Sequence, residues 1–129
     1  MRVMSFAVTK EQMRARTKTV TRRLGWLRLL PGEELLAVER SRGLKKGERV
    51  VPIGVILVVS VRRERLDDLV DPARPGYGAA EMALEGFPGM DPQDFMLRFF
   101  VEQIDPSELV TRIQFSFAPA GAQREEVAP

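Results

Sequence analysis

The stretch that decides the fold is VVPIGVILVVSVRR, at residues 50–63. Val, Ile and Leu dominate it and charged residues bound it, which is typical of a β-strand. Its fourteen residues exceed the usual strand length of about three to ten. Pro52 and Gly54 predict a bulge or bend near its start. The continuous apolar run favours a strand that is covered on both faces.

The sequence LVTRIQFSF, at residues 109–117, alternates between two sets of side chains and predicts a half-buried antiparallel strand. Further extended segments are predicted at residues 3–8, 17–23 and 35–40, with turns at residues 31–32 and 44–48. Helices are predicted at residues 10–15 with Thr9 as N-cap, at 79–84 before Gly86, and at 93–103 after Asp91 and Pro92. We interpret the aromatic stripe of the last helix (Phe95, Met96, Phe99 and Phe100) as core. This order, without regular βαβ alternation, predicts an α+β domain built on a curled, mostly antiparallel sheet.

The length of 129 residues fits one domain. We place that domain at residues 1–118 and expect residues 119–129 to form a flexible tail. The chain has no Cys and no His, which excludes disulfides, thiol nucleophiles and Ser-His or Cys-His catalysis. We expect no metal or other cofactor, since Asp67, Asp68 and Asp71 are typical of a solvated loop. No signal peptide and no membrane span is predicted, so we expect a cytoplasmic protein.

Charge is distributed unevenly along the chain, although the formal net charge is only +2. Residues 1–28 hold eight basic residues against one acid, whereas residues 64–129 hold thirteen acids against five basic residues. Two interpretations remain open: the basic segment contacts an anionic partner, or the two segments neutralise each other across the fold.

The basic segment contains Arg-Thr-Lys-Thr-Val-Thr-Arg-Arg, at residues 16–23. Alone it is a weak signal, because Thr is common in strands and Lys and Arg are common on surfaces. In combination, however, the chain resembles the ASCH family. The similarity extends over MSFAVTKEQMRARTKTVTRRLGW, LPGEELLAVER, GLKKGE, the Val-rich strand, EGFPGMDPQDF and VTRIQF. Within the family the chain is similar to the variant common in phage and prophage genomes.

The resemblance implies a PUA-like β-barrel with short peripheral helices and a cleft that accepts RNA, a nucleotide or a modified nucleoside. Some ASCH relatives use a K-x-x-T motif and a Glu as an amidohydrolase site for N4-acylated cytidine nucleosides. The matching residues here are Lys18, Thr21 and Glu85. The resemblance therefore implies an RNA- or nucleotide-binding protein, with amidohydrolase activity as the alternative. This chain differs from the small hydrolytic relatives in its greater length, the Trp26 segment and a longer loop at residues 67–78.

The alternative activity places specific demands on the three residues. A Thr hydroxyl needs a base, and without His that base would be a Lys whose pKa is lowered by burial or by neighbouring cations. Glu85 would protonate the leaving amine or orient a water molecule. Lys18 and Thr21 are an odd number of residues apart, so a regular strand would place them on opposite faces. A purely structural alternative is a Lys18–Glu85 salt bridge at the barrel rim.

Predicted ligand contacts are the arginines Arg16, Arg22 and Arg23 and the aromatic residues Trp26 and Tyr77. Guanidinium groups suit bidentate recognition of phosphate. Trp26 would stack on a base or pack under the turn at residues 31–32, and Tyr77 would cover a base or anchor its loop. Lys45 and Lys46 lie at a predicted turn, where solvated side chains are the favoured interpretation.

Overall fold

The computed structural model describes residues 1–119, so the predicted tail at residues 119–129 lies almost wholly outside the described residues. Five strands form one sheet in the order β1-β3-β4-β5-β2. The strands are β1 (Arg2–Ser5), β2 (Val20–Arg23), β3 (Glu34–Val38), β4 (Pro52–Arg65) and β5 (Leu109–Phe117). The helices are α1 (Lys10–Arg14), the 3₁₀ helix η1 (Leu66–Val70), α2 (Tyr77–Glu85) and α3 (Pro92–Phe99).

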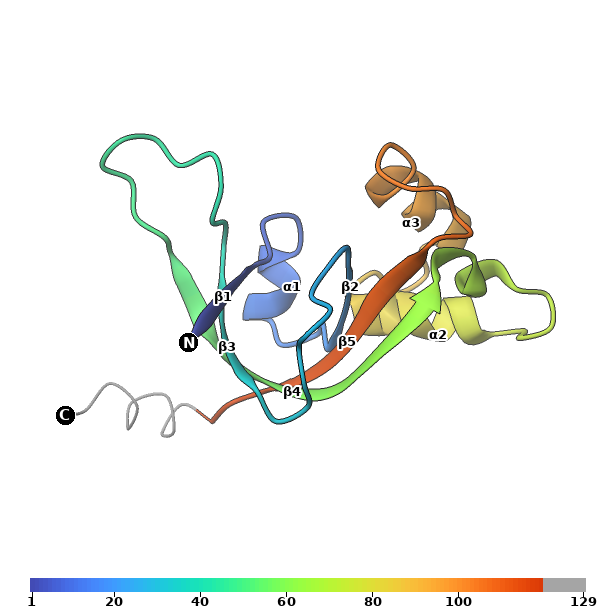
Figure 1. The fold of residues 1–129 in the computed structure, drawn as a ribbon, viewed down its shortest axis with the longest axis horizontal. Coiled ribbons are helices and arrows are strands. Elements are labelled where there is room, and N and C mark those ends of the chain that lie inside the picture. The colour runs from blue at the N-terminus through green and yellow to red at the C-terminus, as the bar shows by residue number, and fades with distance from the viewer. Residues whose placement is uncertain (120–129) are drawn as a thin grey trace.

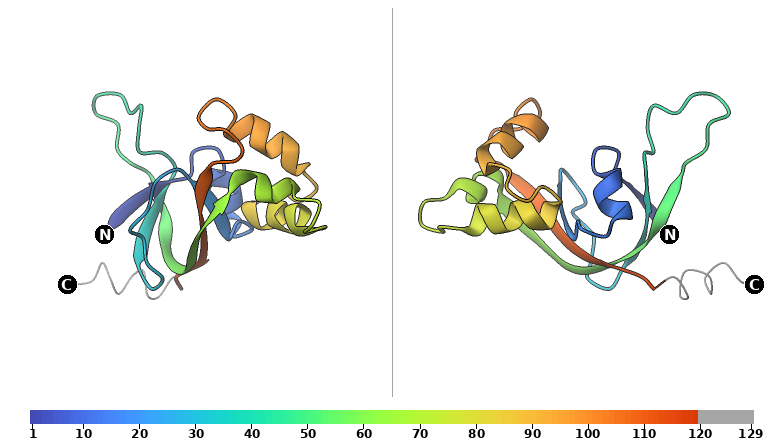
Figure 2. Two further views of the ribbon diagram at one scale, coloured as in Figure 1. Left: turned by 45° about the vertical axis from the view of Figure 1, so that its right-hand side comes forward. Right: turned by 180° about the vertical axis from the view of Figure 1, so that it is seen from behind.

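The sheet is a curled half-barrel, as Figures 1 and 2 show. The long strands β4 and β5 pair antiparallel and form its curved spine. β3 also pairs antiparallel with β4, and β2 with β5, whereas β1 runs parallel to β3. The predicted α+β class with a curled, mostly antiparallel sheet is therefore confirmed.

The predicted bend near Pro52 and Gly54 is confirmed as a bulge. Gly54 pairs with Ala37 and Pro52 with Val38, so one extra residue of β4 interrupts the register. A second register shift lies between Val58 and Ser60, opposite β5. Bulges bend a strand and increase its twist, and these two lie where the fourteen-residue β4 wraps around the core.

The prediction that this strand is covered on both faces is wrong at its centre. Ile56 and Val58 are buried, but Leu57 is 39% exposed and Val59 is 48% exposed. Neighbouring side chains of a strand point to opposite faces, and here the core covers one face alone. The apolar run is therefore a half-buried strand with an apolar outer face.

Two apolar cores lie on the sheet. The first gathers Met4, Phe6, Met13, Leu29, Leu35, Ala37, Ile56, Val58, Ile113 and Phe115. The second lies under the helices and gathers Leu66, Leu69, Met82, Phe95, Met96, Phe100 and Val110. β5 contributes to both cores, Ile113 and Phe115 to the first and Val110 to the second. This explains why both of its faces are buried near residues 110–113, although its alternation predicts one buried face.

Most helix boundaries follow the local signals. Asp91 caps α3 by accepting a hydrogen bond of 2.8 Å from the backbone N–H of Gln93, and Pro92 occupies the first turn. Gly86 ends α2 in the left-handed region, with φ of 97°. Thr9 lies at the N-cap of α1, but its side chain makes no capping hydrogen bond.

Other boundaries differ from the predictions. The predicted strand at 3–8 is β1, which ends at Ser5. α2 begins at Tyr77, within the predicted loop, and the 3₁₀ helix η1 replaces part of that loop. α3 ends at Phe99, so the predicted helix to residue 103 is too long. Within residues 1–119 no helix is long and apolar enough to cross a membrane.

Candidate functional site

A cleft of about 680 Å³ lies where the two edge strands of the curled sheet approach each other. β1 contributes Val3 and Ser5 to its lining, and β2 contributes Thr21, Arg22 and Arg23. The Arg23 guanidinium crosses from one edge to the other, because its Nη2 donates to the Ser5 carbonyl oxygen at 2.7 Å. The curl of the half-barrel therefore creates the cleft.

Lys18 and Glu85 form a buried ion pair in this cleft. The Lys18 Nζ donates to Glu85 Oε1 at 2.7 Å and to the Glu85 carbonyl oxygen at 2.8 Å. Both residues are only 2% exposed. Thr19 fixes the backbone here, because its N–H donates to the Leu84 carbonyl at the end of α2 and its carbonyl accepts from Phe115 of β5. The Lys18–Glu85 salt bridge considered from the sequence is thus present, and it is buried.

The environment of Lys18 lowers the pKa of its ammonium group. Burial is the largest cause, and the positive charges of Arg23 and Arg22 act in the same direction. The charge and hydrogen bond of Glu85 oppose this shift without cancelling it. A lowered pKa makes the neutral amine more accessible near neutral pH than in a free Lys.

Lys18 and Thr21 both line the cleft, despite their odd spacing. β2 begins at Val20, so Lys18 precedes the strand and the alternation rule does not apply to it. Thr21 is buried, and its Oγ1 accepts a hydrogen bond of 3.0 Å from Arg23 Nε. Within residues 1–119 no hydrogen bond joins Lys18 to Thr21.

Arg23 is a partly buried cation without a carboxylate partner among the described residues. Its guanidinium donates to Thr21 Oγ1 and to the Ser5 carbonyl, and it lies 4.7 Å from the ring centre of Phe6. Burial lowers the pKa of Arg23 to about 10, although the negative charge of Glu85 opposes the shift. Arg23 therefore stays charged at neutral pH and its charge is not neutralised by contact.

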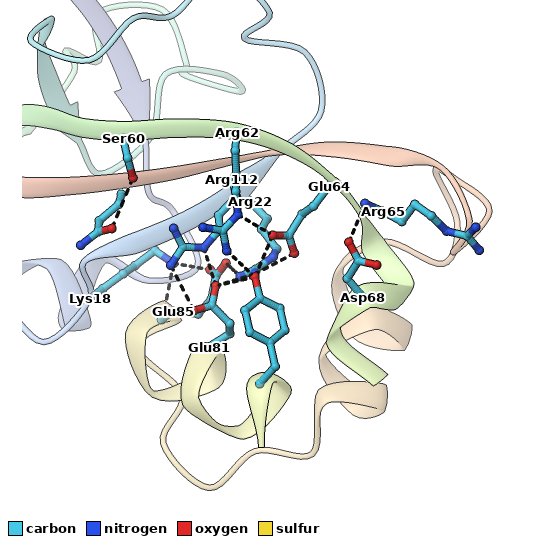
Figure 3. Close-up of polar contacts among 12 residues, drawn as sticks. Lys18, Arg22, Ser60, Arg62, Glu64, Arg65, Asp68, Glu81, Glu85 and Arg112 are labelled. Carbon is cyan, nitrogen blue, oxygen red and sulfur yellow. Dashed lines mark hydrogen bonds and ion pairs between the residues drawn. The ribbon is translucent and has the colours of Figure 1, made fainter. Parts of the chain in front are cut away.

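Arg22 points into a cluster of buried acids instead. Its side chain is fully buried and donates to Glu85 Oε2 at 3.0 Å, to Glu64 Oε2 at 3.1 Å and to Glu81 Oε1 (Figure 3). Burial disfavours its charge, but Glu85, Glu64 and Glu81 outweigh burial and raise the pKa of Arg22. Its Nε is the one buried side-chain polar atom of residues 1–119 without a hydrogen-bond partner.

Three arginines lie in one cross-strand row in this cluster. Arg22 of β2 is paired in register with Arg112 of β5, which is paired in turn with Arg62 of β4. Like charges directly opposite each other destabilise a sheet. Glu81 compensates by accepting hydrogen bonds from both Arg22 and Arg112.

The carboxylates reach the row from α2 and from β4. Tyr77, Glu81 and Glu85 follow one another at intervals of four along α2, so they share one helix face. The Tyr77 hydroxyl donates to Glu64 Oε1 at 2.7 Å and accepts from Arg62 Nη2 at 2.6 Å. Burial opposes the charged forms of Glu64 and Glu81, but their arginine partners lower the pKa of each carboxyl.

Six of the eight residues predicted for the site line the cleft: Lys18, Thr21, Glu85, Arg22, Arg23 and Trp26. Trp26 has a left-handed backbone with φ of 54°, and the Arg2 guanidinium lies 5.1 Å from its ring. Arg16 does not line the cleft and instead lies 4.4 Å from the ring of Phe117. Tyr77 is also absent from the lining. Its hydroxyl donates to Glu64, within the acid–arginine cluster formed by Arg22, Arg62, Arg112, Glu64, Glu81 and Glu85.

Other lining residues were not predicted as site residues. Phe87 and Phe99 are partly exposed and also line the cleft, with ring centres 5.4 Å apart. The interpretation of the α3 stripe as core is right for Phe95, Met96 and Phe100, which belong to the second core. The residues at positions 40–42, Arg-Ser-Arg, also line the cleft. Within the described part of the chain, no three acidic side chains are grouped so as to hold a metal ion.

Comparison with solved structures gives two similar folds. A mutant of the ASCH protein ZmASCH from Zymomonas mobilis matches with a TM-score of 0.53 at 15% identity, covering 88% of this chain and 67% of that chain. A DUF984 protein from Enterococcus faecalis matches with a TM-score of 0.59 at 15% identity, covering 91% of this chain and 79% of that chain. No protein-family model and no curated protein sequence matches. At this identity the similarity establishes the fold alone, and the chain therefore has the ASCH-like fold that its sequence resemblance implied.

Proposed function

We propose that the cleft binds RNA or a nucleotide, with a phosphate at Arg23. The observation that carries this proposal is the position of Arg23, a partly exposed residue that lines the cleft and makes no ion pair with any residue in 1–119. A partly desolvated cation without a carboxylate favours an anionic ligand. Arg22 does not suit this role, because three carboxylates already occupy its guanidinium.

The aromatic residues that line the cleft support a base or nucleoside as the rest of the ligand. Phe87, Phe99 and Trp26 all contribute to its lining. Aromatic faces stack on nucleobases, and each stacked base is worth about 1–3 kcal/mol. A cleft lined by both the Arg23 cation and aromatic rings offers partners for the phosphate and for the base of a nucleotide.

The chain provides its own probe for this test, because Trp26 is its only Trp and lines the cleft. We would titrate the four ribonucleoside 5′-monophosphates and follow tryptophan fluorescence. Wild-type protein is expected to show saturable quenching with at least one of them. Arg23→Gln should weaken that affinity by about ten- to a hundred-fold, as for loss of a hydrogen bond to a charged group.

Arg63→Gln is the matched control, since Arg63 is exposed, makes no ion pair with the described residues and lies outside the cleft lining. It is expected to bind like wild type. Equal affinities of Arg23→Gln and wild type would overturn the assignment of the phosphate to Arg23. If no mononucleotide quenches the fluorescence and a single-stranded RNA does not bind either, the proposed function itself is overturned.

The alternative function is an amidohydrolase acting on N4-acylated cytidine nucleosides. It is favoured by the common cleft of Lys18, Thr21 and Glu85 and by the lowered pKa of Lys18. In this reaction a proton first passes from the Lys18 ammonium to the Glu85 carboxylate, which gives a neutral amine and a carboxylic acid. The Thr21 oxygen then attacks the amide carbon while Lys18 takes the hydroxyl proton. The amine leaves with a proton from Glu85, and water then hydrolyses the acyl ester. The resting hydrogen bonds of Thr21 to Arg23 and of Lys18 to Glu85 would have to exchange first.

Turnover of N4-acetylcytidine, followed by chromatography, tests this alternative. An amidohydrolase would lose turnover in Thr21→Val, which keeps the side-chain shape, and would retain a measurable fraction in Thr21→Ser. Absence of turnover in wild-type protein that still binds nucleotides would leave the binding function alone.

A further inference from the structure

The segment that joins β3 to β4, residues 39–51, projects away from the sheet as an arm. The N–H of Glu39 donates to the Val51 carbonyl at 2.9 Å and closes its base. Figures 1 and 2 show the arm and α3 rising on the same side of the sheet. Residues 45–50 of the arm are all exposed.

The arm is strongly basic. Five basic residues (Arg40, Arg42, Lys45, Lys46 and Arg49) stand against Glu39 and Glu48. Both acids have partners: Glu39 pairs with Arg14 at 2.7 Å, and Glu48 accepts from Arg40 at 2.8 Å and from the Lys45 N–H at 2.9 Å. The remaining four cations make no ion pair with any side chain in residues 1–119.

The base of the arm is continuous with the cleft. Arg40, Ser41 and Arg42 line the same cavity as Arg23 and Lys18. The basic residues of the cleft lining therefore continue along the chain, through Arg40 and Arg42, into Lys45, Lys46 and Arg49 of the arm. A single nucleotide in the cleft would leave these outer cations without a ligand.

We propose that the arm binds the phosphodiester backbone of a single strand whose terminal or flipped nucleotide occupies the cleft. This inference rests on the proposed function of the cleft. A positively charged track joined to aromatic rings is the arrangement by which proteins hold single-stranded nucleic acid. The strand has to be unpaired, because a base stacked on Phe87 or Phe99 cannot remain in a duplex.

Binding is measured with the full chain by Trp26 fluorescence and by anisotropy of a labelled strand. The probes are the best-binding mononucleotide and a ten-nucleotide RNA of mixed sequence that cannot pair with itself. The DNA strand of the same sequence shows whether the 2′-hydroxyl contributes. The arm variant is Lys45→Ala with Lys46→Ala and Arg49→Ala, and the matched control is Arg28→Ala with Arg63→Ala and Arg98→Ala. The control residues are exposed and lie outside both arm and cleft.

The RNA strand is expected to bind at least ten-fold more tightly than the mononucleotide. Each phosphate contact to a single strand adds about 0.7 to the slope of log affinity against log salt. The arm variant should therefore lose about 2 from that slope, so that raising salt from about 50 to 200 mM weakens it about twenty-fold less than wild type. Its affinity for the mononucleotide should not change.

Two results would overturn the inference. If the strand binds no more tightly than the mononucleotide, or if the arm variant keeps the slope of its control, the arm is a solvated loop and the cleft takes a lone nucleotide. If neither probe binds, the proposed function fails and the arm proposal fails with it. The mononucleotide titration separates these two cases.

Discussion

Arg22 and Arg112 face each other across β2 and β5, and both guanidinium groups donate to the same carboxylate, that of Glu81. Arg22 is 4% exposed and Arg112 is 5% exposed, so water does not screen the repulsion between their charges. Because Glu81 belongs to α2, the helix is attached to the sheet by charge as well as by apolar packing. The same helix carries Glu85 into the cleft, so the acid–arginine cluster also positions the candidate site.

Glu81→Gln is expected to destabilise the protein strongly. The substitution keeps the shape of the side chain but leaves two buried arginines opposite each other without that negative charge. Breaking a buried charge network by removing one partner costs about 3–5 kcal/mol in the free energy of unfolding. Denaturant unfolding followed by circular dichroism would measure this loss.

Glu102→Gln provides the control for this change, because Glu102 is exposed and makes no ion pair with the described residues. Its free energy of unfolding should stay within about 0.5 kcal/mol of wild type. If Glu81→Gln proved as stable as this control, the row of arginines would not need the carboxylate.

Acid should remove the contribution of the same cluster. Burial raises the pKa of Glu81, but Arg112 and Arg22 lower it further, so it lies below its ordinary value of 4.5. Below pH 4.5 the unfolded chain therefore binds more protons than the folded chain, and the free energy of unfolding falls as pH decreases through the folded pKa. The stability difference between wild type and Glu81→Gln should be constant above pH 5 and shrink below about 4.5.

Comparing the two proteins at each pH cancels the exposed ion pairs, such as Arg2–Glu33, which titrate in both. A difference that stayed constant down to pH 3 would contradict the assigned role of the Glu81 charge.

Much of the fold is predictable because the local signals agree with the tertiary structure. Residues 109–117 form a strand over the predicted range, and the Val-rich strand lies two residues further along than expected. Asp91, Pro92 and Gly86 each perform the capping or terminating role that their residue types favour. Lys18, Thr21 and Glu85 share a cleft, which the family resemblance implied and strand alternation opposed.

The acid–arginine cluster was not predictable to the same extent. In a half-buried strand, the alternation of residues 109–117 assigns Arg112 to the exposed face. Its burial depends on α2 covering that face, and on a register between β2 and β5 that no local pattern encodes. The spacing of Tyr77, Glu81 and Glu85 by four residues was the available signal, since it places three polar side chains on one helix face. Because the loop was predicted to extend through residue 78, the start of α2 at Tyr77 was not predicted.

Phe99→Leu should weaken nucleotide binding if the cleft has the proposed function. Phe99 is partly exposed at the end of α3 and lines the cleft beside Phe87. Loss of one stacking ring is expected to cost about 1–3 kcal/mol of binding free energy, measured by Trp26 fluorescence. Phe117→Leu is the control, since Phe117 is also partly buried against another Phe ring but lies outside the cleft. Equal affinities in the two variants would exclude stacking on Phe99.

Substitutions at Gly86 and Gly89 test whether the backbone after α2 has to pack closely against Lys18. Gly86 and Gly89 both have left-handed backbones, with φ of 97° and 83°. An Ala at either position carries the strain of that conformation, about 1–2 kcal/mol. A Cβ at residue 89 would meet no atom within 4 Å, whereas at residue 86 it would lie 3.0 Å from Gln12 Cβ and 3.3 Å from Lys18 Cβ.

Gly86→Ala should therefore lower the free energy of unfolding by about 1–3 kcal/mol more than Gly89→Ala, because the close contact adds overpacking to the same backbone strain. It should also displace Lys18 from Glu85, so that nucleotide affinity changes in Gly86→Ala and not in Gly89→Ala. Denaturant unfolding and the Trp26 titration measure the two effects separately. Equal stabilities would show that Gln12 and Lys18 move aside at little cost, and that the site tolerates a Cβ where α2 ends.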